Sequence, residues 1–180
     1  MINQEERSYL LSYSRSILEK FYGVSDVVDD FKISDHVCLK KRYGVFATLY
    51  NSGKLRGCMG RLLSSDPLFE TLKYCLINSA TSDPRFPAVQ TEELDSLNIE
   101  ISILSELKLI KDIDEIIIGK HGIYIKNPAG NGTLLPQVAV EQNWSVKEFL
   151  GYCSRDKAGL SWDAWKLSEV YIYESLILKE

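Results

Sequence analysis

The chain has 180 residues, a length that suits one compact domain or two intimately packed lobes rather than two independent domains. Apolar residues make up 45% and charged residues 26%, which leaves enough apolar side chain for the core of a folded, soluble protein. The net charge of -4 counts against a domain that holds nucleic acid through its phosphates, and Lys40-Lys41-Arg42 is the only basic run. We therefore do not expect a nucleic-acid partner.

The sequence also bears on the compartment and on metal chemistry. Residues 1–7 are polar and acidic and every apolar run is short, so neither a signal peptide nor a membrane span is predicted. We expect a cytoplasmic protein whose cysteines stay reduced, since they lie far apart and form no C-x-x-C pair. No metal site or other cofactor is predicted, because neither His36 nor His121 has a ligand partner at a recognised spacing.

Capping and turn signals divide the first half of the chain. Asn3 and Glu6 have the spacing of a capping box, and aromatic and apolar residues recur behind them every four positions. Residues 24–42 show no clear pattern. In chain order, the predicted elements are a helix from Asn3 to about Tyr22, a strand over Tyr43–Tyr50, a turn over Asn51–Lys54, a returning strand from Leu55, and a helix to about Ser79 with Asp66 as N-cap and Pro67 in its first turn.

The second half alternates short strands with turns. Ile99, Ile101 and Ile103 alternate with polar residues, which is typical of a half-buried strand. The other predicted elements are a short helical turn from Thr91, a hairpin of Ile116–Ile118 and Ile123–Ile125 around Gly119–Gly122, a turn-rich loop over Asn127–Gly132, a strand over Thr133–Leu135 ended by Pro136, a helix from a Ser145–Glu148 capping box, a final turn capped by Ser161 that bears Trp162 and Trp165, and a closing strand from Val170 to Leu178. Because hairpins outnumber β-α-β signals, we predict an α+β fold in which helices flank an antiparallel sheet.

The most informative segment is Leu55-Arg56-Gly57-Cys58-Met59-Gly60. In an extended strand Arg56 and Cys58 project from one face, while Leu55 and Met59 face the core. An arginine near a cysteine stabilises the thiolate, which is the reactive form, and the glycines let a ligand or another backbone approach closely. The segment could therefore form a site for an anion or an electrophile. Equally, the glycines could serve a β-bulge, with Cys58 as a small core residue.

A second candidate is the loop Asp83-Pro84-Arg85-Phe86-Pro87, which its prolines hold out of regular structure. The stiff loop could present Arg85 to a carboxylate or a phosphate. Equally, Asp83 could cap a turn while Arg85 pairs with it or with Glu92-Glu93. Since loops both connect elements and carry functional residues, the two readings stay open.

His121 lies between Gly119 and Gly122 in the predicted hairpin tip. Imidazole titrates near neutral pH, so His121 could act as a general acid or base. A Cys58–His121 pair would then resemble an activated nucleophile. The alternative is a solvated turn residue, and spacing in the sequence does not decide between the two.

Five blocks of the chain follow one another in a characteristic order: Leu55–Gly60, Asp83–Pro87, Gly119–Gly122, Leu134–Ala139 with Trp144, and Lys157–Leu160. With their spacing, these blocks closely resemble the AMMECR domain family, whose prokaryotic members are called AmmeMemoRadiSam system protein A. The resemblance runs from the N-terminal helix to about Trp165. Met59 stands where isoleucine is usual, which conserves volume.

The resemblance implies a single AMMECR-like domain over residues 1–180, with a larger lobe that contains both termini and a smaller inserted lobe. It implies that Arg56-Gly57-Cys58 lies near the cleft of this fold. It also implies an association with a Memo-like protein and a radical S-adenosylmethionine enzyme. It does not supply a reaction.

On these grounds we predict an accessory or binding subunit that engages a partner protein or a small-molecule ligand through the cleft around Arg56-Gly57-Cys58. The alternative is a free-standing enzyme with Cys58 as nucleophile, Arg56 and Arg85 as anion binders and His121 as proton carrier. The candidate catalytic residues are Cys58 and His121, and the candidate binding residues are Arg56, Gly57, Gly60, Asp83, Arg85, Phe86 and Gln137.

Overall fold

The computed structural model describes residues 2–25 and 37–180, and the chain divides into two units. The first unit comprises Met1–Ile103 and Leu176–Glu180, and the second comprises Leu104–Ser175. Both contain helices and antiparallel strands, which confirms the predicted α+β class. Within the described residues, every helix is too short or too polar to cross a bilayer. Most of the stretch 24–42 lies outside these residues.

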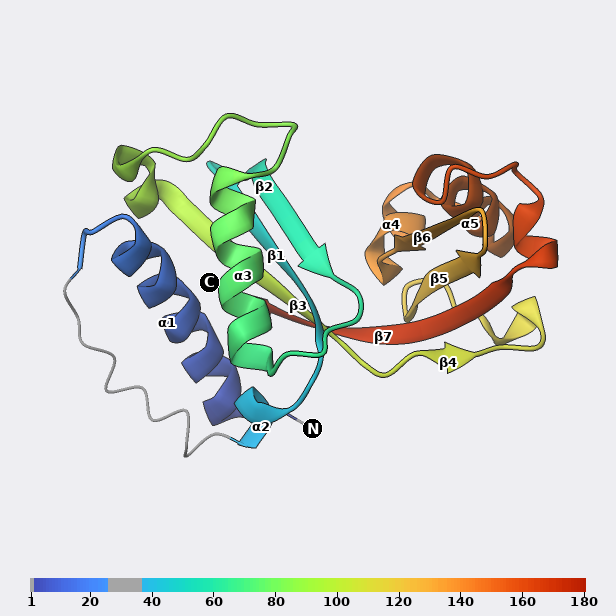
Figure 1. Cartoon of the computed structure of the whole chain (residues 1–180), viewed down its shortest axis with the longest axis horizontal. Coiled ribbons are helices and arrows are strands. Elements are labelled where there is room, and N and C mark those ends of the chain that lie inside the picture. The colour runs from blue at the N-terminus through green and yellow to red at the C-terminus, as the bar shows by residue number, and fades with distance from the viewer. Residues whose placement is uncertain (1, 26–36) are drawn as a thin grey trace. The chain divides into compact units, whose positions relative to one another are not determined.

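The first unit packs two helices against its strands. Its elements are α1 (Gln4–Phe21), α2 (Val37–Lys40), β1 (Gly44–Asn51), β2 (Lys54–Arg61), α3 (Leu68–Thr81), the 3-10 helix η2 (Thr91–Ser96), β3 (Leu97–Leu104) and the C-terminal end of β7 (Glu169–Lys179). The strands lie in the order β2-β1-β3-β7, so β2 is an edge strand. Helix α3 contacts α1, β1 and β2, and Figure 1 shows the two helices side by side.

Helix α1 begins at the predicted capping box. The Asn3 side chain accepts a hydrogen bond from the Glu6 N–H at 2.8 Å, and the Glu6 carboxylate accepts one from the Asn3 N–H at 2.9 Å. The helix ends at Phe21 with Tyr22 as C-cap, and Gly23 follows in the left-handed region with a φ of 68°. The local capping signals therefore set both ends correctly.

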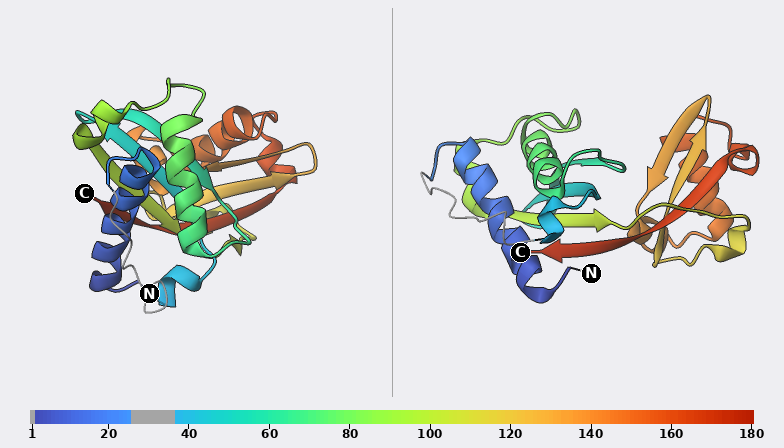
Figure 2. Two further views of the ribbon diagram at one scale, coloured as in Figure 1. Left: turned by 60° about the vertical axis from the view of Figure 1, so that its left-hand side comes forward. Right: turned by 60° about the horizontal axis from the view of Figure 1, so that its bottom comes forward.

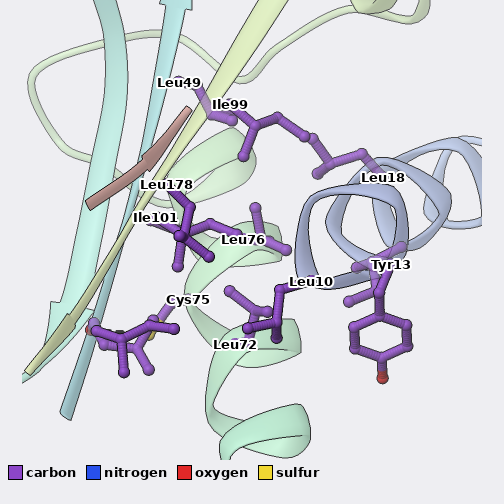
Figure 3. Close-up of a cluster of buried hydrophobic side chains, with 14 of the residues drawn as sticks. Leu10, Tyr13, Leu18, Leu49, Leu72, Cys75, Leu76, Ile99, Ile101 and Leu178 are labelled. Carbon is purple, nitrogen blue, oxygen red and sulfur yellow. Dashed lines mark hydrogen bonds between the residues drawn. The ribbon is translucent and has the colours of Figure 1, made fainter. Parts of the chain in front are cut away.

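Apolar side chains from α1, α3 and the strands form the core of the first unit. Figure 3 shows Leu10 and Leu18 of α1, Leu72 and Leu76 of α3, and Ile99 and Ile101 of β3 turned toward one cluster. These side chains are fully or almost fully buried. The strand predicted from the alternating isoleucines is confirmed in β3, but it is not half-buried, because Glu100 and Ser102 between the isoleucines are also buried.

The second unit is built on antiparallel strands with helical segments packed on them. Its elements are β4 (Lys108–Leu109), the 3-10 helix η3 (Ile113–Glu115), β5 (His121–Asn127), β6 (Gly130–Leu134), α4 (Pro136–Glu141), α5 (Val146–Tyr152), the π-helical segment η4 (Cys153–Lys157), the 3-10 helix η5 (Ala164–Leu167) and the N-terminal part of β7. Strand β5 pairs with both β6 and β7, and β4 pairs with β7. The helical segments lie against β5 and β6 (Figure 2), where Phe149 and Leu150 of α5 are fully buried.

The predicted second hairpin is wrong. Ile116–Ile118 follows η3 and enters a turn, in which the N–H groups of Lys120 and His121 both donate to the Ile117 carbonyl. The hairpin is instead β5–β6, which includes most of the predicted Asn127–Gly132 loop. The glycines that favoured a loop are strand residues paired with β5, and a side chain at Gly130 or Gly132 would overlap the backbone at the end of η4.

Two predicted helix caps are also wrong. Helix α3 begins at Leu68 with Pro67 as its N-cap and without a side-chain cap, because Asp66 pairs instead with Arg61 at 3.1 Å. The last short helix, η5, begins at Ala164 with Asp163 before it. Ser161 contributes only its carbonyl, which accepts from the Ala164 N–H. A cap depends on which partner its side chain meets, and sequence spacing does not show that partner.

Candidate functional site

The Leu55–Gly60 segment lies in β2 and contains a bulge. Leu49 of β1 pairs with Gly57, whereas Tyr50 pairs with Leu55, so Arg56 is an extra residue on β2. The extra residue breaks the alternation expected of a regular strand. Leu55 is 38% exposed, and the prediction that it faces the core is therefore wrong.

Both glycines of the segment sit where the protein's own atoms approach closely. A side chain at Gly57 would overlap the Ser79 carbonyl of α3, and one at Gly60 would overlap the Phe46 ring. The glycines could have made room for a ligand or for another part of the chain, and the structure supports the second explanation. Any substitution at Gly57 would push against a backbone atom, which cannot move aside as a flexible side chain can.

Ser79 joins the segment to α3 and is a residue that the sequence analysis missed. Its Oγ accepts a hydrogen bond from the Met59 N–H at 2.8 Å and donates to the Ala47 carbonyl at 2.8 Å. Ser79 is only 2% exposed. The signal in the sequence is a serine four residues after Cys75 and seven after Leu72, which places a polar side chain on the apolar stripe of the helix.

The Asp83–Arg85 pair caps the outer edge of β2 at Cys58. Asp83 Oδ2 accepts from the Cys58 N–H at 2.8 Å, and Arg85 Nη2 donates to the Cys58 carbonyl at 3.4 Å. Arg85 also donates from Nε and Nη2 to the two carboxylate oxygens of Asp83. The Arg85 guanidinium holds the pKa of Asp83 well below its usual range, even though burial opposes this shift. The two predicted candidates, the β2 segment and the 83–87 loop, thus form one structure.

Arg56 is committed to a different partner. Its Nε and Nη2 donate to the two oxygens of Glu93 at 2.8 and 2.9 Å, and the Pro87 and Ala88 carbonyls accept from Nη1 and Nη2. The hydrogen bond from Arg56 lowers the pKa of Glu93 to about 2. Arg85, rather than Arg56, is therefore the arginine that contacts Cys58.

Cys58 differs from the other cysteines of the chain. It is partly exposed, whereas Cys38, Cys75 and Cys153 are buried. Desolvation is the largest cause that raises the pKa values of these three, to about 11, 11 and 12. The Cys58 Sγ accepts a hydrogen bond from Thr48 Oγ1 at 3.3 Å, across the β1–β2 pair. Thr48 could have been found from the sequence only by assuming the correct register of the hairpin.

The remaining candidates are Phe86 in the first unit and His121 and Gln137 in the second. Phe86 is partly exposed, with its ring centroid 5.5 Å from the Arg85 Cζ. His121 is the first residue of β5 and is 8% exposed, so it is not a solvated turn residue. Its Nδ1 accepts from the Ile117 N–H at 3.1 Å. Gln137 lies in α4, and its buried Oε1 meets no donor among the described residues.

The described residues contain no group of three or more His, Cys, Asp or Glu side chains arranged to hold a metal ion. In the first unit, the carboxylates of Asp83 and Glu93 are both used by arginines. What this cluster can do chemically therefore depends on the groups that remain open: the thiol of Cys58, the outward edge of Arg85 and the ring of Phe86.

Known proteins resemble the chain over nearly its whole length. The model of a family described as AMMECR1 matches residues 11–178. Protein NEQ441 of Nanoarchaeum equitans is 43% identical over 162 residues, which cover 84% of this chain and 89% of that protein. Protein MJ0810 of Methanocaldococcus jannaschii is 37% identical over 190 residues, which cover 100% of this chain and 92% of that protein. The crystal structure of the uncharacterized protein PH0010 from Pyrococcus horikoshii shares the fold, with a TM-score of 0.88, 33% identity, and 99% and 93% coverage.

Proposed function

Since the chain belongs to the AMMECR1 family, we propose that it is an accessory or binding subunit that works with a Memo-like protein and a radical S-adenosylmethionine enzyme. The proposed binding surface is formed by Cys58, Arg85 and Phe86, which we call the Cys58 surface. In the AMMECR signature described above, these three residues lie in the blocks 55–60 and 83–87. A small-molecule ligand bound at the same surface is compatible with this role.

One observation carries the choice of a binding subunit over a free-standing enzyme: the charged groups around Cys58 are used within the fold. Asp83 accepts the Cys58 N–H and pairs with Arg85, so its carboxylate stays ionised and engaged. Arg56 is bound to Glu93 and to two carbonyls. Among the described residues of the first unit there is no histidine to serve as a base. These contacts build a rigid surface rather than a nucleophile–base pair.

The side chains left open suit recognition of a partner protein. The Arg85 side chain is 55% exposed, and the Phe86 ring beside it is partly exposed. Arginine and aromatic side chains often supply most of the binding energy of an interface. Arg85 is also held in place by its fork-like contact with Asp83, so little side-chain entropy is lost when a partner binds.

The test is the affinity of the full chain for the Memo-like protein of the same organism, measured by titration calorimetry. We expect Arg85→Ala and Phe86→Ala each to weaken binding about tenfold or more, and Cys58→Ser to leave it nearly unchanged. The matched control is Arg155→Ala. Arg155 is 53% exposed, pairs with Asp156 and lies over the Tyr152 and Trp162 rings, so it has the same kind of surroundings in the second unit. Loss of binding in Cys58→Ser alone would refute the proposed role.

The second candidate is a free-standing enzyme that uses Cys58 as nucleophile, with Arg56, Arg85 and His121 in support. The partial exposure of Cys58, unlike the burial of the other three cysteines, favours it. This candidate requires an activated thiol, because the thiolate is the reacting species. We would then expect iodoacetamide to alkylate Cys58 faster than a free model thiol at neutral pH. A rate no faster than that of the model thiol would count against the enzyme.

A further inference from the structure

The ion pair of Asp83 and Arg85 turns its negative half inward and its positive half outward. The Asp83 side chain is 2% exposed, whereas the Arg85 side chain is 55% exposed. Both oxygens of Asp83 already accept hydrogen bonds, from Arg85 and from the Cys58 N–H. A group that approaches from solvent therefore meets the guanidinium rather than the carboxylate.

Arg85 keeps unused donors on its outward side. A guanidinium carries five N–H groups, and those of Nε and Nη2 are directed to Asp83 and to the Cys58 carbonyl. In the part of the chain that the structure describes, no acceptor takes a hydrogen bond from Nη1 of Arg85. Arg56 is the contrasting case, since its Nε, Nη1 and Nη2 all have acceptors and its side chain is only 14% exposed.

Cys58 is in direct contact with Arg85, because Nη2 of Arg85 donates to the Cys58 carbonyl at 3.4 Å. The Thr48 hydroxyl holds Sγ from the neighbouring strand at 3.3 Å. A cation with free donors is thus fixed to the same residue that carries the partly exposed thiol.

From this arrangement we infer that the open edge of Arg85 and the Cys58 thiol form a binding site for a carboxylate, supplied by a small ligand or by an acidic side chain of a partner protein. The inference rests on the proposed function in that it names the chemical group the Cys58 surface takes up. A carboxylate matches the planar donor edge of arginine. A phosphate dianion fits less well, because Asp83 offsets part of the charge of Arg85 and Arg56 is occupied by Glu93.

The charge preference can be measured with two alkylating reagents on the full chain. Iodoacetate is an anion and iodoacetamide is neutral, and in both reactions the Cys58 thiolate displaces iodide. The ratio of the two rates therefore cancels the thiolate fraction and reports the local charge. A unit charge about 4 Å away changes a rate about fivefold in water, and Asp83 cancels part of this effect, so we expect Arg85→Gln to lower the ratio about threefold. Salt should reduce the difference.

Arg61→Gln is the matched control. Arg61 ends the same strand and is partly exposed, but the groups that act on it are Tyr74, Asp66 and Cys75 rather than Cys58. This variant should leave the ratio unchanged. An Arg85→Gln ratio equal to that of the wild type at low salt would overturn the inference. If Arg85→Gln fails to fold, the wild-type ratio decides: a native ratio no higher than that of the protein unfolded in urea overturns it as well.

Protection of Cys58 from iodoacetamide identifies the source of the carboxylate. Acetate and a short peptide rich in aspartate and glutamate are compared at equal carboxylate concentration. Protection by acetate supports a small ligand, protection by the peptide alone supports an acidic side chain of a partner, and protection by neither overturns the inference. An unchanged rate ratio with normal partner binding would leave the proposed function standing. A charge-dependent ratio without partner binding would support the carboxylate site and refute the proposed function.

Discussion

Replacing Ser79 with alanine tests how firmly the Cys58 segment is attached to α3. The Ser79 hydroxyl accepts from the Met59 N–H and donates to the Ala47 carbonyl, each at 2.8 Å, and the residue is 2% exposed. Alanine removes the hydroxyl and leaves the Met59 amide without this acceptor. A buried donor left unpaired costs about 1–3 kcal/mol, so we expect the free energy of unfolding to fall by about 2 kcal/mol.

Ser14 of α1 provides the matched control. It is also fully buried, and its hydroxyl donates to the Leu10 carbonyl four residues earlier at 2.7 Å. The single hydroxyl hydrogen of Ser79 is shared between the Ala47 carbonyl at 2.8 Å and the Cys75 carbonyl, four residues earlier, at 2.7 Å. Ser14→Ala therefore removes only a hydrogen bond within a helix, which both serines make. It leaves the contacts of Ser79 with β1 and β2 intact. We expect it to cost about 1 kcal/mol less than Ser79→Ala.

Urea unfolding followed by circular dichroism gives both free energies, and hydrogen exchange reports the Met59 amide directly. In a chain of 180 residues, a loss of about 2 kcal/mol corresponds to a fall in Tm of about 4–8 °C. Equal costs for the two variants, with unchanged protection of the Met59 amide, would refute the reasoning. That result would mean that β2 holds its place on β1 without the serine.

Three further predictions concern Gly57, the Arg56–Glu93 pair and the four cysteines. Gly57→Ala should destabilise the protein by about 1–3 kcal/mol or more, because the added methyl group meets the Ser79 carbonyl; a urea midpoint equal to that of the wild type would contradict this. Arg56 lowers the pKa of Glu93 from 4.5 to about 2, so the stability that this pair contributes is present at neutral pH and is lost as the pH falls from 4.5 toward 2. Acid unfolding of Glu93→Gln should therefore be less steep over that window, and a profile parallel to the wild type would argue against the linkage. Iodoacetamide should modify Cys58 alone in the native protein and all 4 cysteines in urea, as measured by intact mass, because the other thiols are buried; early labelling of Cys75 or Cys153 would show that their burial is not maintained.

The elements that follow from local chemistry were predictable from the sequence. The Asn3–Glu6 and Ser145–Glu148 capping boxes both occur as expected, because each is formed by residues three positions apart. The isoleucines of β3 repeat every two residues and were equally readable as a strand, although the burial of Glu100 and Ser102 between them was not. The two central blocks of the candidate site, 55–60 and 83–87, were also recognisable as sequence motifs before their contacts were known.

Which of these residues meet depends on the three-dimensional fold. Arg56 is the extra residue of the bulge and pairs with Glu93, and the loop after α3 brings Arg85 to Cys58, although the sequence had placed Arg56 beside Cys58. Likewise, Gly130 and Gly132 carry the signals of a loop, yet they pair with β5 as strand residues and lack side chains where the end of η4 packs against them. Local patterns were sufficient to predict α1, α3, α5, the strands of the first hairpin and the residue types of the site, but not α2 or α4. Pairing of arginines and close approach of glycines depend on atoms distant in the chain, whose positions no local pattern records.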